Sequence, residues 1–454
     1  MAESPWLMET SAPLFPQSLA GAVCAVEGIR GATALLHGST GCKFHVSALV
    51  EQMDPREGLQ APLAGTVLRL YGQARVPCTD VWGEDLVFGG EAKLEHALAT
   101  LDSSDAADRP GLVAVITTTP LAATAEDVLG VIRSRDWRAR VVHVDGGGLL
   151  GGAPEGFERA LKVLTRDVMR PDAPKRPGSV NLVGLTIGHP RWQDDVAELR
   201  RMLANLGVEV NAVLTAGASL AEIVNAPAAE LSVVVHPEYG AAVSAEMRRA
   251  FDQPFVCADG YAPYGLAAAE AWLRGVGEAI GIPQPALDDA LAAEAASVRR
   301  RILPHLAALD RRSPLKGRPV AVFGEAGPAV SLAAFLVGYL GLEVALLGLK
   351  SGGAAAETQL QRLERDFGPI PSVLWQPDLT AVKDALAEVR PDLVFGSSFE
   401  RAAAQAAGLP AERHVDFGYP LWHRITVVER PFVGYRGAIA LVEDIVNAAM
   451  ALDR

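Results

Sequence analysis

Short apolar runs of strand length alternate with longer amphipathic segments along the whole chain. The clearest strand-length runs are residues 32–37, 112–117, 180–185, 231–236, 319–324 and 392–396. Helical spacing of apolar positions follows several of them, as in 194–206 and 330–340, and a glycine comes directly after each of these two segments (Gly207 and Gly341). This alternation predicts an α/β protein built from Rossmann-like units with mostly parallel sheets.

Two stretches rich in proline and charge, 170–178 and 310–318, interrupt this pattern, and each is followed by a new apolar run. A chain of 454 residues is also too long for one ordinary hydrophobic core. We therefore predict three Rossmann-like domains, at residues 1–172, 178–310 and 316–454. The first of them contains the candidate metal ligands described below.

The most apolar segment, 329–349, is interrupted by Gly341 and Glu343, so we expect a buried helix followed by a strand rather than a membrane span. The net charge of −13 argues against binding to nucleic acid, because nothing basic would neutralise the phosphates. The N-terminus has Glu3 and Glu9 and no basic segment followed by an apolar one, unlike a secretory signal. We expect a cytoplasmic protein.

The chain has four cysteines, and without a secretory signal we favour thiol chemistry or metal binding over disulfides. The loop 38–41 follows the strand ending at His37 and leads to Cys42 at the start of a predicted helix. The positive end of a helix dipole favours the thiolate, which is the form that binds iron. The alternative interpretation is that Cys42 is only a small residue in a tight turn.

Five segments, taken in order, resemble motifs of the nitrogenase component 1 family. They are LLHGSTGC at 35–42, EDLVFGG at 84–90, AVITTTPLAATAEDV at 114–128, GYPLWHR at 418–424 and GYRG at 434–437. Their order over nearly the whole chain makes the family resemblance strong. The pattern is closest to the second, beta-type or assembly-scaffold subunit of that family.

The resemblance implies an iron–sulfur cluster at an interface between two related subunits, with electrons supplied by a separate ATP-dependent iron–sulfur reductase. Cys42 falls on a ligand position of most family members. Gln17 and Thr119 fall on two further ligand positions, and neither is a thiol. This loss favours a simpler 4Fe-4S cluster that is shared with a homologous component 1-type partner subunit.

Two other cysteines of the first predicted domain are candidate metal ligands. Cys24 comes seven residues, or two helical turns, after Gln17 and would point to a similar side of the helix, although it could equally be a small core residue. Cys78 precedes the EDLVFGG motif, where the resemblance assigns no ligand. The fourth cysteine, Cys257, is interpreted as a core residue.

In the catalytic subunits of the family, a cysteine and a histidine hold a larger metallocluster between the domains. His236 falls on that cysteine position and His414 falls beside the histidine position, so both are candidates to line an interdomain pocket. The alternative is that each is a buried, hydrogen-bonded histidine. The glycine-rich segments 145–152 and 324–328 contain no phosphate-loop GK[ST], and we interpret both as βα turns.

Three functional hypotheses follow. The first is a subunit of a nitrogenase-like oxidoreductase that relays electrons through an interface cluster. The second is a non-catalytic scaffold subunit on which a metallocluster is assembled. The third is a cluster-free structural or small-molecule-binding subunit. The motifs do not distinguish between substrates.

Overall fold

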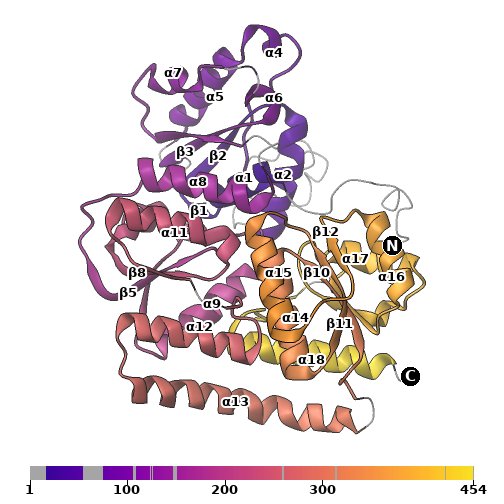
Figure 1. The fold of residues 1–454 in the computed structure, drawn as a ribbon. Coiled ribbons are helices and arrows are strands. Elements are labelled where there is room, and N and C mark those ends of the chain that lie inside the picture. The colour runs from indigo at the N-terminus through magenta and orange to yellow at the C-terminus, as the bar shows by residue number, and fades with distance from the viewer. Residues whose placement is uncertain are drawn as a thin grey trace.

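The computed structural model describes residues 17–54, 75–105, 109–122, 124, 126–146, 151–257, 260–311, 314–424 and 426–452. In these residues the chain forms three parallel sheets, each with helices packed around it (Figure 1). The three units follow one another along the chain, from the indigo and magenta unit at the top of the view to the orange and yellow unit at the lower right. The predicted α/β class with mostly parallel sheets is confirmed.

The first unit has a sheet in the order β2-β3-β4, formed by β2 (Ala32–His37), β3 (Leu112–Thr117) and β4 (Arg140–Asp145). Its helices are α1 (Ser18–Glu27), α2 (Thr40–Met53), α4 (Asp85–Phe88), α5 (Glu91–Ser103), α6 (Thr119–Ala122), α7 (Val128–Arg133) and α8 (Ala153–Asp167). The strands are buried over most of their length, which explains their continuous apolar character.

Helices α1 and α8 pack backbone to backbone through two glycines. A Cβ on Gly21 would lie 1.9 Å from the carbonyl oxygen of Ala153, and one on Gly156 would lie 1.8 Å from that of Ser18. The small residues of α1 therefore permit a close approach that fixes the helix directly under the cysteine-bearing end of the sheet.

The middle unit has the strand order β6-β5-β8-β9, formed by β5 (Arg176–Val183), β6 (Glu209–Val213), β8 (Ala229–Val234) and β9 (Phe255–Cys257). Its helices are α9 (Trp192–Ala204), α10 (Leu220–Val224), the 3-10 helix η3 (Ala226–Ala228), α11 (Pro237–Phe251), α12 (Gly265–Ile280) and α13 (Gln284–Asp310). A short parallel pair, β1 (Ile29–Arg30) with β7 (Ala218–Ser219), joins the first unit to the middle one.

The C-terminal unit has the strand order β12-β11-β10-β13-β14, formed by β10 (Pro319–Gly324), β11 (Glu343–Leu349), β12 (Val373–Trp375), β13 (Leu393–Gly396) and β14 (His414–Asp416). Its helices are α14 (Ala326–Leu340), α15 (Ala354–Phe367), α16 (Leu379–Val389), α17 (Ser398–Ala406), the 3-10 helix η4 (Ala411–Arg413) and α18 (Gly434–Leu452). The strand order reverses beside β10, which is where ligands bind in open α/β sheets.

The boundaries between the units lie close to the predicted linkers, with two differences in detail. Strand β5 already begins at Arg176, just before the predicted start at 178. Helix α18 returns to pack against α9, α12 and α13 of the middle unit, as Figure 1 shows along the lower edge of the molecule. The apolar segment 329–349 forms most of α14 and then β11, as predicted. None of the helices in the described residues is long and apolar enough to cross a membrane.

Candidate functional site

Strand β2 ends at a buried histidine that joins three segments distant in sequence. Nδ1 of His37 lies 3.0 Å from Oγ1 of Thr79, and Nε2 lies 2.6 Å from a carboxylate oxygen of Glu126. The other oxygen of Glu126 accepts the backbone N–H of Gly90 at 2.8 Å. Both ring nitrogens are thus engaged, so the end of β2 is held firmly. Three of the sequence motifs described above meet at this point.

The loop after β2 brings Cys42 into the first turn of α2. A side chain has no room at Gly38, because a Cβ there would lie 2.4 Å from Oγ1 of Thr118. Ser39 precedes the helix in an extended conformation, and its hydroxyl donates to the sulfur of Cys42 at 3.6 Å. The thiol is partly exposed, so an external group can reach its sulfur.

Cys78 lies against the same loop. Its residue pairs with Leu36 of β2 in an isolated bridge, and its thiol donates to the carbonyl of Gly38 at 3.5 Å. The backbone N–H of Asp80 donates to the sulfur at 3.2 Å. Burial raises the pKa of Cys78, and the Asp80 N–H opposes that rise. The structure therefore brings Cys42 and Cys78 to one short loop, although they are far apart in sequence.

Cys24 lies elsewhere. It is buried within α1, and its side chain faces Thr186 of the middle unit. Burial raises the pKa of this thiol to about 12, so it is protonated at neutral pH. A protonated thiol enclosed by protein is a poor ligand for a cluster at a subunit interface, and the structure does not unite Cys24 with the loop of Cys42. Cys257 ends β9 in the middle unit, partly buried.

The two non-thiol positions of the sequence comparison lie at the same edge of the first sheet as Cys42. Gln17 directly precedes α1 and pairs with Gly152, in the connection between β4 and α8. Thr119 begins α6, directly after β3. This edge is the carboxyl end of β2, β3 and β4, where loops from neighbouring parallel strands converge.

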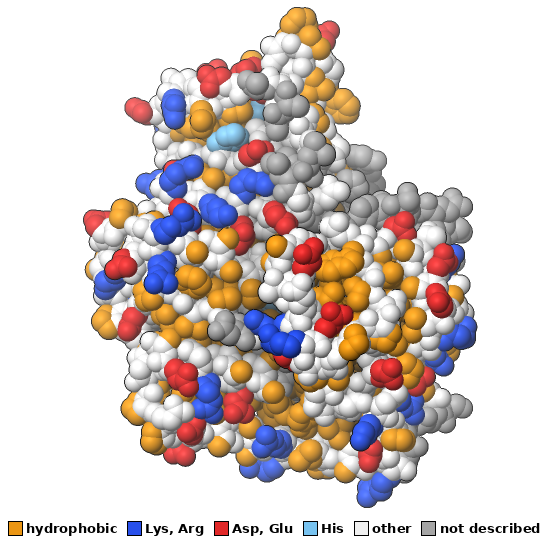
Figure 2. All heavy atoms as spheres, viewed as in Figure 1, with side chains coloured by type: hydrophobic (Ala, Val, Ile, Leu, Met, Phe, Trp, Pro, Cys, Tyr) orange, Lys and Arg blue, Asp and Glu red, His pale blue; other side chains and the backbone are white. Residues whose placement is uncertain are grey.

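Exposed apolar side chains surround this edge. We call them the apolar tip: Phe44, Trp82, Leu86, Val87 and Phe88. Phe88 is 84 % exposed and Val87 is 75 % exposed. Figure 2 shows apolar side chains over the top of the first unit, where α4 lies in Figure 1. Apolar groups gathered in this way are typical of a surface that another protein covers.

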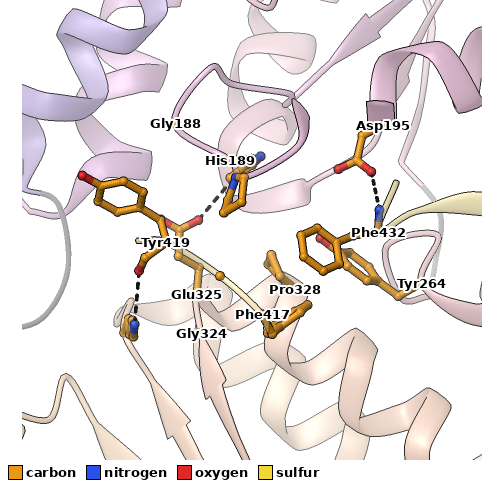
Figure 3. A pocket seen from close by; sticks show the side chains of 13 residues that line it. Gly188, His189, Asp195, Tyr264, Gly324, Glu325, Pro328, Phe417, Tyr419 and Phe432 are labelled. Atoms are coloured by element: carbon orange, nitrogen blue, oxygen red, sulfur yellow. Dashed lines mark hydrogen bonds and ion pairs between the residues drawn. The ribbon is translucent and has the colours of Figure 1, made fainter. Parts of the chain in front are cut away.

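A second concave site lies between the middle and C-terminal units (Figure 3). It is situated where β5 and β10 end, which agrees with the rule for ligand sites in parallel sheets. It is lined by Gly188, His189, Pro190, Asp195, Tyr264, Gly324, Glu325, Pro328, Lys350, Phe417, Gly418, Tyr419 and Phe432. None of these residues is a cysteine. We refer to this site as the interdomain pocket.

The polar centre of the interdomain pocket is a hydrogen-bonded glutamate. The hydroxyl of Tyr239 donates to Glu325 at 2.7 Å, and Nε2 of His189 lies 3.3 Å from the second carboxylate oxygen. Burial alone would raise the pKa of Glu325, but the bonds from His189 and Tyr239 outweigh it and the pKa falls below its usual range. The pocket thus contains a carboxylate that is ionised at neutral pH.

His236 lies directly behind this centre. It precedes α11, its ring packs edge-on against that of His189 with 4.7 Å between the centroids, and neither ring nitrogen makes a hydrogen bond. Burial, with a smaller contribution from His189, lowers the pKa of His236 well below its usual range. The side chain therefore supports the wall of the pocket from inside and is not among its lining residues.

His414 does not line the interdomain pocket. It begins β14, whereas the pocket starts beyond the end of that strand, at Phe417. His414 instead lies beside Asp416 and His423. Burial lowers the pKa of His414 to about 4, with Asp416 opposing that change.

Two charged groups of the pocket were not predicted from the sequence. Nζ of Lys350 forms a buried ion pair with Glu400 at 3.0 Å and also donates to Ser397 at 3.3 Å. Asp195, in the first turn of α9, accepts the backbone N–H of Phe432 at 2.7 Å (Figure 3). Burial raises the pKa of Asp195 to about 7. Their partners are distant in sequence, so no local signal identified them.

The segment 324–328 forms a βα turn, as predicted. The free N–H groups at the start of α14 already have protein partners, since Ala326 donates to Ser351 at 2.7 Å and Gly327 donates to Glu238 at 2.9 Å. These contacts leave no room for a phosphate. The other glycine-rich segment, 145–152, lies partly outside the described residues.

The fold and its sites define a class of protein: three Rossmann-like units in one chain, with partly exposed thiols at an outer sheet edge and a polar pocket between two of the units. Residues 18–450 match the nitrogenase component 1 type oxidoreductase family, and the chain belongs to that family. The resemblance predicted from the motifs is confirmed. Membership supports a role as a subunit of a nitrogenase-like complex and, in general, a metal–sulfur cofactor.

The curated relatives are of beta type. The chain is 33% identical over 306 residues to the beta-type subunit of the light-independent protochlorophyllide reductase of Methylobacterium sp. (strain 4-46), which covers 66% of this chain and 56% of the relative. It thus spans a little over half of that relative. It is 24% identical over 469 residues to the nitrogenase molybdenum-iron protein beta chain of Methanococcus maripaludis, covering 95% of this chain and 92% of the relative.

A solved structure of nitrogenase Cp1 at pH 6.5 superimposes with a TM-score of 0.79 at 19% sequence identity, covering 97% of this chain and 93% of that one. At this identity the likeness establishes the fold alone.

Proposed function

We propose that this chain is one subunit of a nitrogenase-like oxidoreductase in which Cys42 and Cys78 help to hold an iron–sulfur cluster at a subunit interface. Under this proposal the other ligands come from a homologous component 1-type partner, and an ATP-dependent iron–sulfur reductase supplies the electrons. Such a cluster, when bound, supplies low-potential one-electron chemistry. The observation that carries the proposal is the meeting of two partly exposed thiols at one loop.

The donor set fits a shared cluster better than one held by this chain alone. A 4Fe-4S cluster is usually held by four cysteine thiolates. Two sulfurs lie at the loop 38–42, while Cys24 is buried on the far side of α1 and Gln17 and Thr119 have no thiol. A partner subunit therefore has to complete the ligand set, as expected for a cluster at an interface.

The apolar tip supports the partner. Trp82 is 60 % exposed and follows Cys78 by four positions, and Phe44 is two positions after Cys42. Backbone contacts keep these segments together, because the N–H of Val81 donates to the carbonyl of Gly38 at 2.9 Å. A partner that covered this surface would bury apolar area and would also exclude water from the cluster, which tunes its potential.

The experiment is an anaerobic reconstitution of the full chain with ferrous iron and sulfide, alone and together with the co-expressed partner. Iron content and the EPR spectrum of the reduced protein are measured for the wild type, Cys42→Ser, Cys78→Ser and Cys257→Ser. We expect Cys42→Ser to lose most of the iron and Cys78→Ser to lose iron or change the spectrum. Cys257→Ser removes an equally partly buried thiol from another unit and should match the wild type.

Iron that persists unchanged in Cys42→Ser would refute the proposed ligand, and a wild type without iron in the presence of the partner would favour a cluster-free subunit. Turnover distinguishes the remaining roles. A complex that reduces a substrate when given reductase, ATP and reductant is an oxidoreductase, whereas one that only transfers its cluster is an assembly scaffold. Protochlorophyllide-like tetrapyrroles and dinitrogen are the first substrates to try, since the relatives are named for such reactions.

A further inference from the structure

A group of possible metal ligands lies at the edge of the C-terminal sheet, away from the cysteines. His414 and Asp416 are the first and last residues of β14, and His423 lies in the connection to α18. One ligand atom from each of the three lies within 4.8 Å of the others. It is the one group of three or more such residues that meets this criterion within the described part of the chain.

The three side chains converge on one oxygen. Nε2 of His423 lies 2.7 Å from Oδ1 of Asp416, and Nε2 of His414 lies 3.5 Å from the same oxygen. The two rings face each other edge-on, with 5.4 Å between their centroids. Two imidazoles and one carboxylate oriented in this way form a common ligand set for zinc and for non-haem iron.

The second observation is that His414 has no hydrogen-bond partner. Its side chain is only 3 % exposed, and neither ring nitrogen makes a hydrogen bond. Buried polar groups in folded proteins are nearly always paired, and an exception calls for an explanation such as an ion. The unpaired Nε2 faces the space next to Asp416.

The contacts around the group would orient it for an ion. Oγ of Ser398 lies 2.8 Å from Nδ1 of His423 and accepts the backbone N–H of Trp422 at 2.8 Å, which fixes the ring and leaves Nε2 facing inward. Arg424 contacts the other oxygen of Asp416 at 3.4 Å, which leaves Oδ1 available. Such outer contacts are typical of metal sites.

We propose that His414, Asp416 and His423 bind a divalent transition-metal ion through two imidazole nitrogens and one carboxylate oxygen. Ligands about 2.1 Å from an ion can lie at most about 4.2 Å apart. The 4.8 Å spread therefore has to contract slightly, which a small rotation of the partly exposed His423 ring allows. A water molecule on the exposed side of His423 would complete the coordination.

The ion would fix the connection after β14 to the strand itself. That connection also contains Trp422, whose indole N–H donates to Gln52 of α2 at 2.9 Å. A metal ion at this position would hold the C-terminal unit in its contact with the helix that begins at Cys42. This role is independent of the proposed cluster.

The test uses the full-length, metal-stripped protein and Co²⁺ as the probe, followed by absorption spectroscopy and calorimetry. The wild type should bind one Co²⁺ per chain, with visible bands and no thiolate-to-cobalt charge-transfer band. His423→Ala and Asp416→Asn should each weaken this binding by at least about 100-fold. His305→Ala, which removes an exposed histidine of α13, should bind like the wild type.

His423 is partly exposed, so its replacement should leave the fold intact, and circular dichroism verifies this for each variant. Binding that His423→Ala leaves unchanged would overturn the proposal. A thiolate charge-transfer band would also overturn it, because the ion would then be at the cysteines. Failure of the folded wild type to bind Co²⁺ saturably would have the same consequence.

Discussion

Replacing Asp195 with asparagine should change how the stability of the protein depends on pH. The Asp195 carboxylate is buried in the first turn of α9 and accepts the backbone N–H groups of Phe432 at 2.7 Å and Val433 at 3.1 Å. It thereby holds the connection to α18 against the middle unit. Burial outweighs these two bonds and raises the pKa of Asp195 from 3.8 to about 7.

The sign of the effect follows from proton binding. Between about pH 4 and 7 the native state keeps a proton on Asp195 that the unfolded state has lost, so unfolding releases a proton and stability falls as the pH rises. This contribution is fully present below the unfolded pKa and is lost as the pH rises through the folded pKa. The two pKa values differ by about three, and each pH unit corresponds to about 1.4 kcal/mol, so the loss approaches about 4 kcal/mol at pH 8.

Asparagine keeps an oxygen acceptor for the two backbone N–H groups and cannot ionise. We therefore expect Asp195→Asn to be close to the wild type in stability at pH 4.5 and more stable than the wild type by up to about 4 kcal/mol at pH 8. Urea denaturation followed by tryptophan fluorescence measures this difference, and Trp192 lies one turn away from the substitution.

Asp194→Asn is the matched control. Asp194 is the neighbouring carboxylate, is partly exposed and also accepts a backbone N–H, from Arg430 at 2.9 Å. Its replacement should leave the pH dependence of stability as in the wild type. If the stability difference between Asp195→Asn and the wild type were equal at pH 4.5 and pH 8, the carboxyl would not change its protonation over that range and the reasoning would fail.

Two further substitutions test the loop of the cysteines and the interdomain pocket. Gly38→Ala should displace the loop, because the new Cβ would meet the side chain of Thr118, and iron bound on reconstitution should fall several-fold; Gly41→Ala, whose Cβ would meet nothing closer than 3.8 Å, should retain it. Lys350→Met leaves a buried carboxylate without its cation and should lower the free energy of unfolding by about 3–5 kcal/mol, whereas Lys383→Met breaks an exposed pair and should cost less than about 1 kcal/mol, both by urea denaturation.

The fold was predictable because its signals are local. Apolar strands alternating with amphipathic helices leave few arrangements other than parallel α/β units, and the glycine after α14 ends that helix in the left-handed conformation as expected. The return of α18 to the middle unit had no local signal. It depends on contacts such as the one between Asp195 and the backbone of Phe432, 237 positions apart.

The candidate sites divide in the same way. Cys42 was predictable because a strand, a tight loop and a helix start are adjacent in sequence, whereas Cys78 comes to that loop through pairing with Leu36. Helical spacing suggested that Cys24 points to the side of Gln17, but the spacing could not show that the middle unit covers this face. His414 was expected at the pocket from its nearness to a strand end, yet it is the first residue of β14 rather than the last.

The three sites of the molecule meet at one helix, a relation that spacing along the chain could not reveal. Helix α2 has Cys42 in its first turn and Gln52 in its last. The side chain of Gln52 accepts hydrogen bonds from Trp422, beside the proposed ion site, and from Tyr419, in the wall of the interdomain pocket, at 3.4 Å for the latter. Because a helix is stiff, a displacement of the connection after β14 is transmitted to the end of α2. The position of the cysteine loop therefore depends on the C-terminal unit as well as on the first sheet.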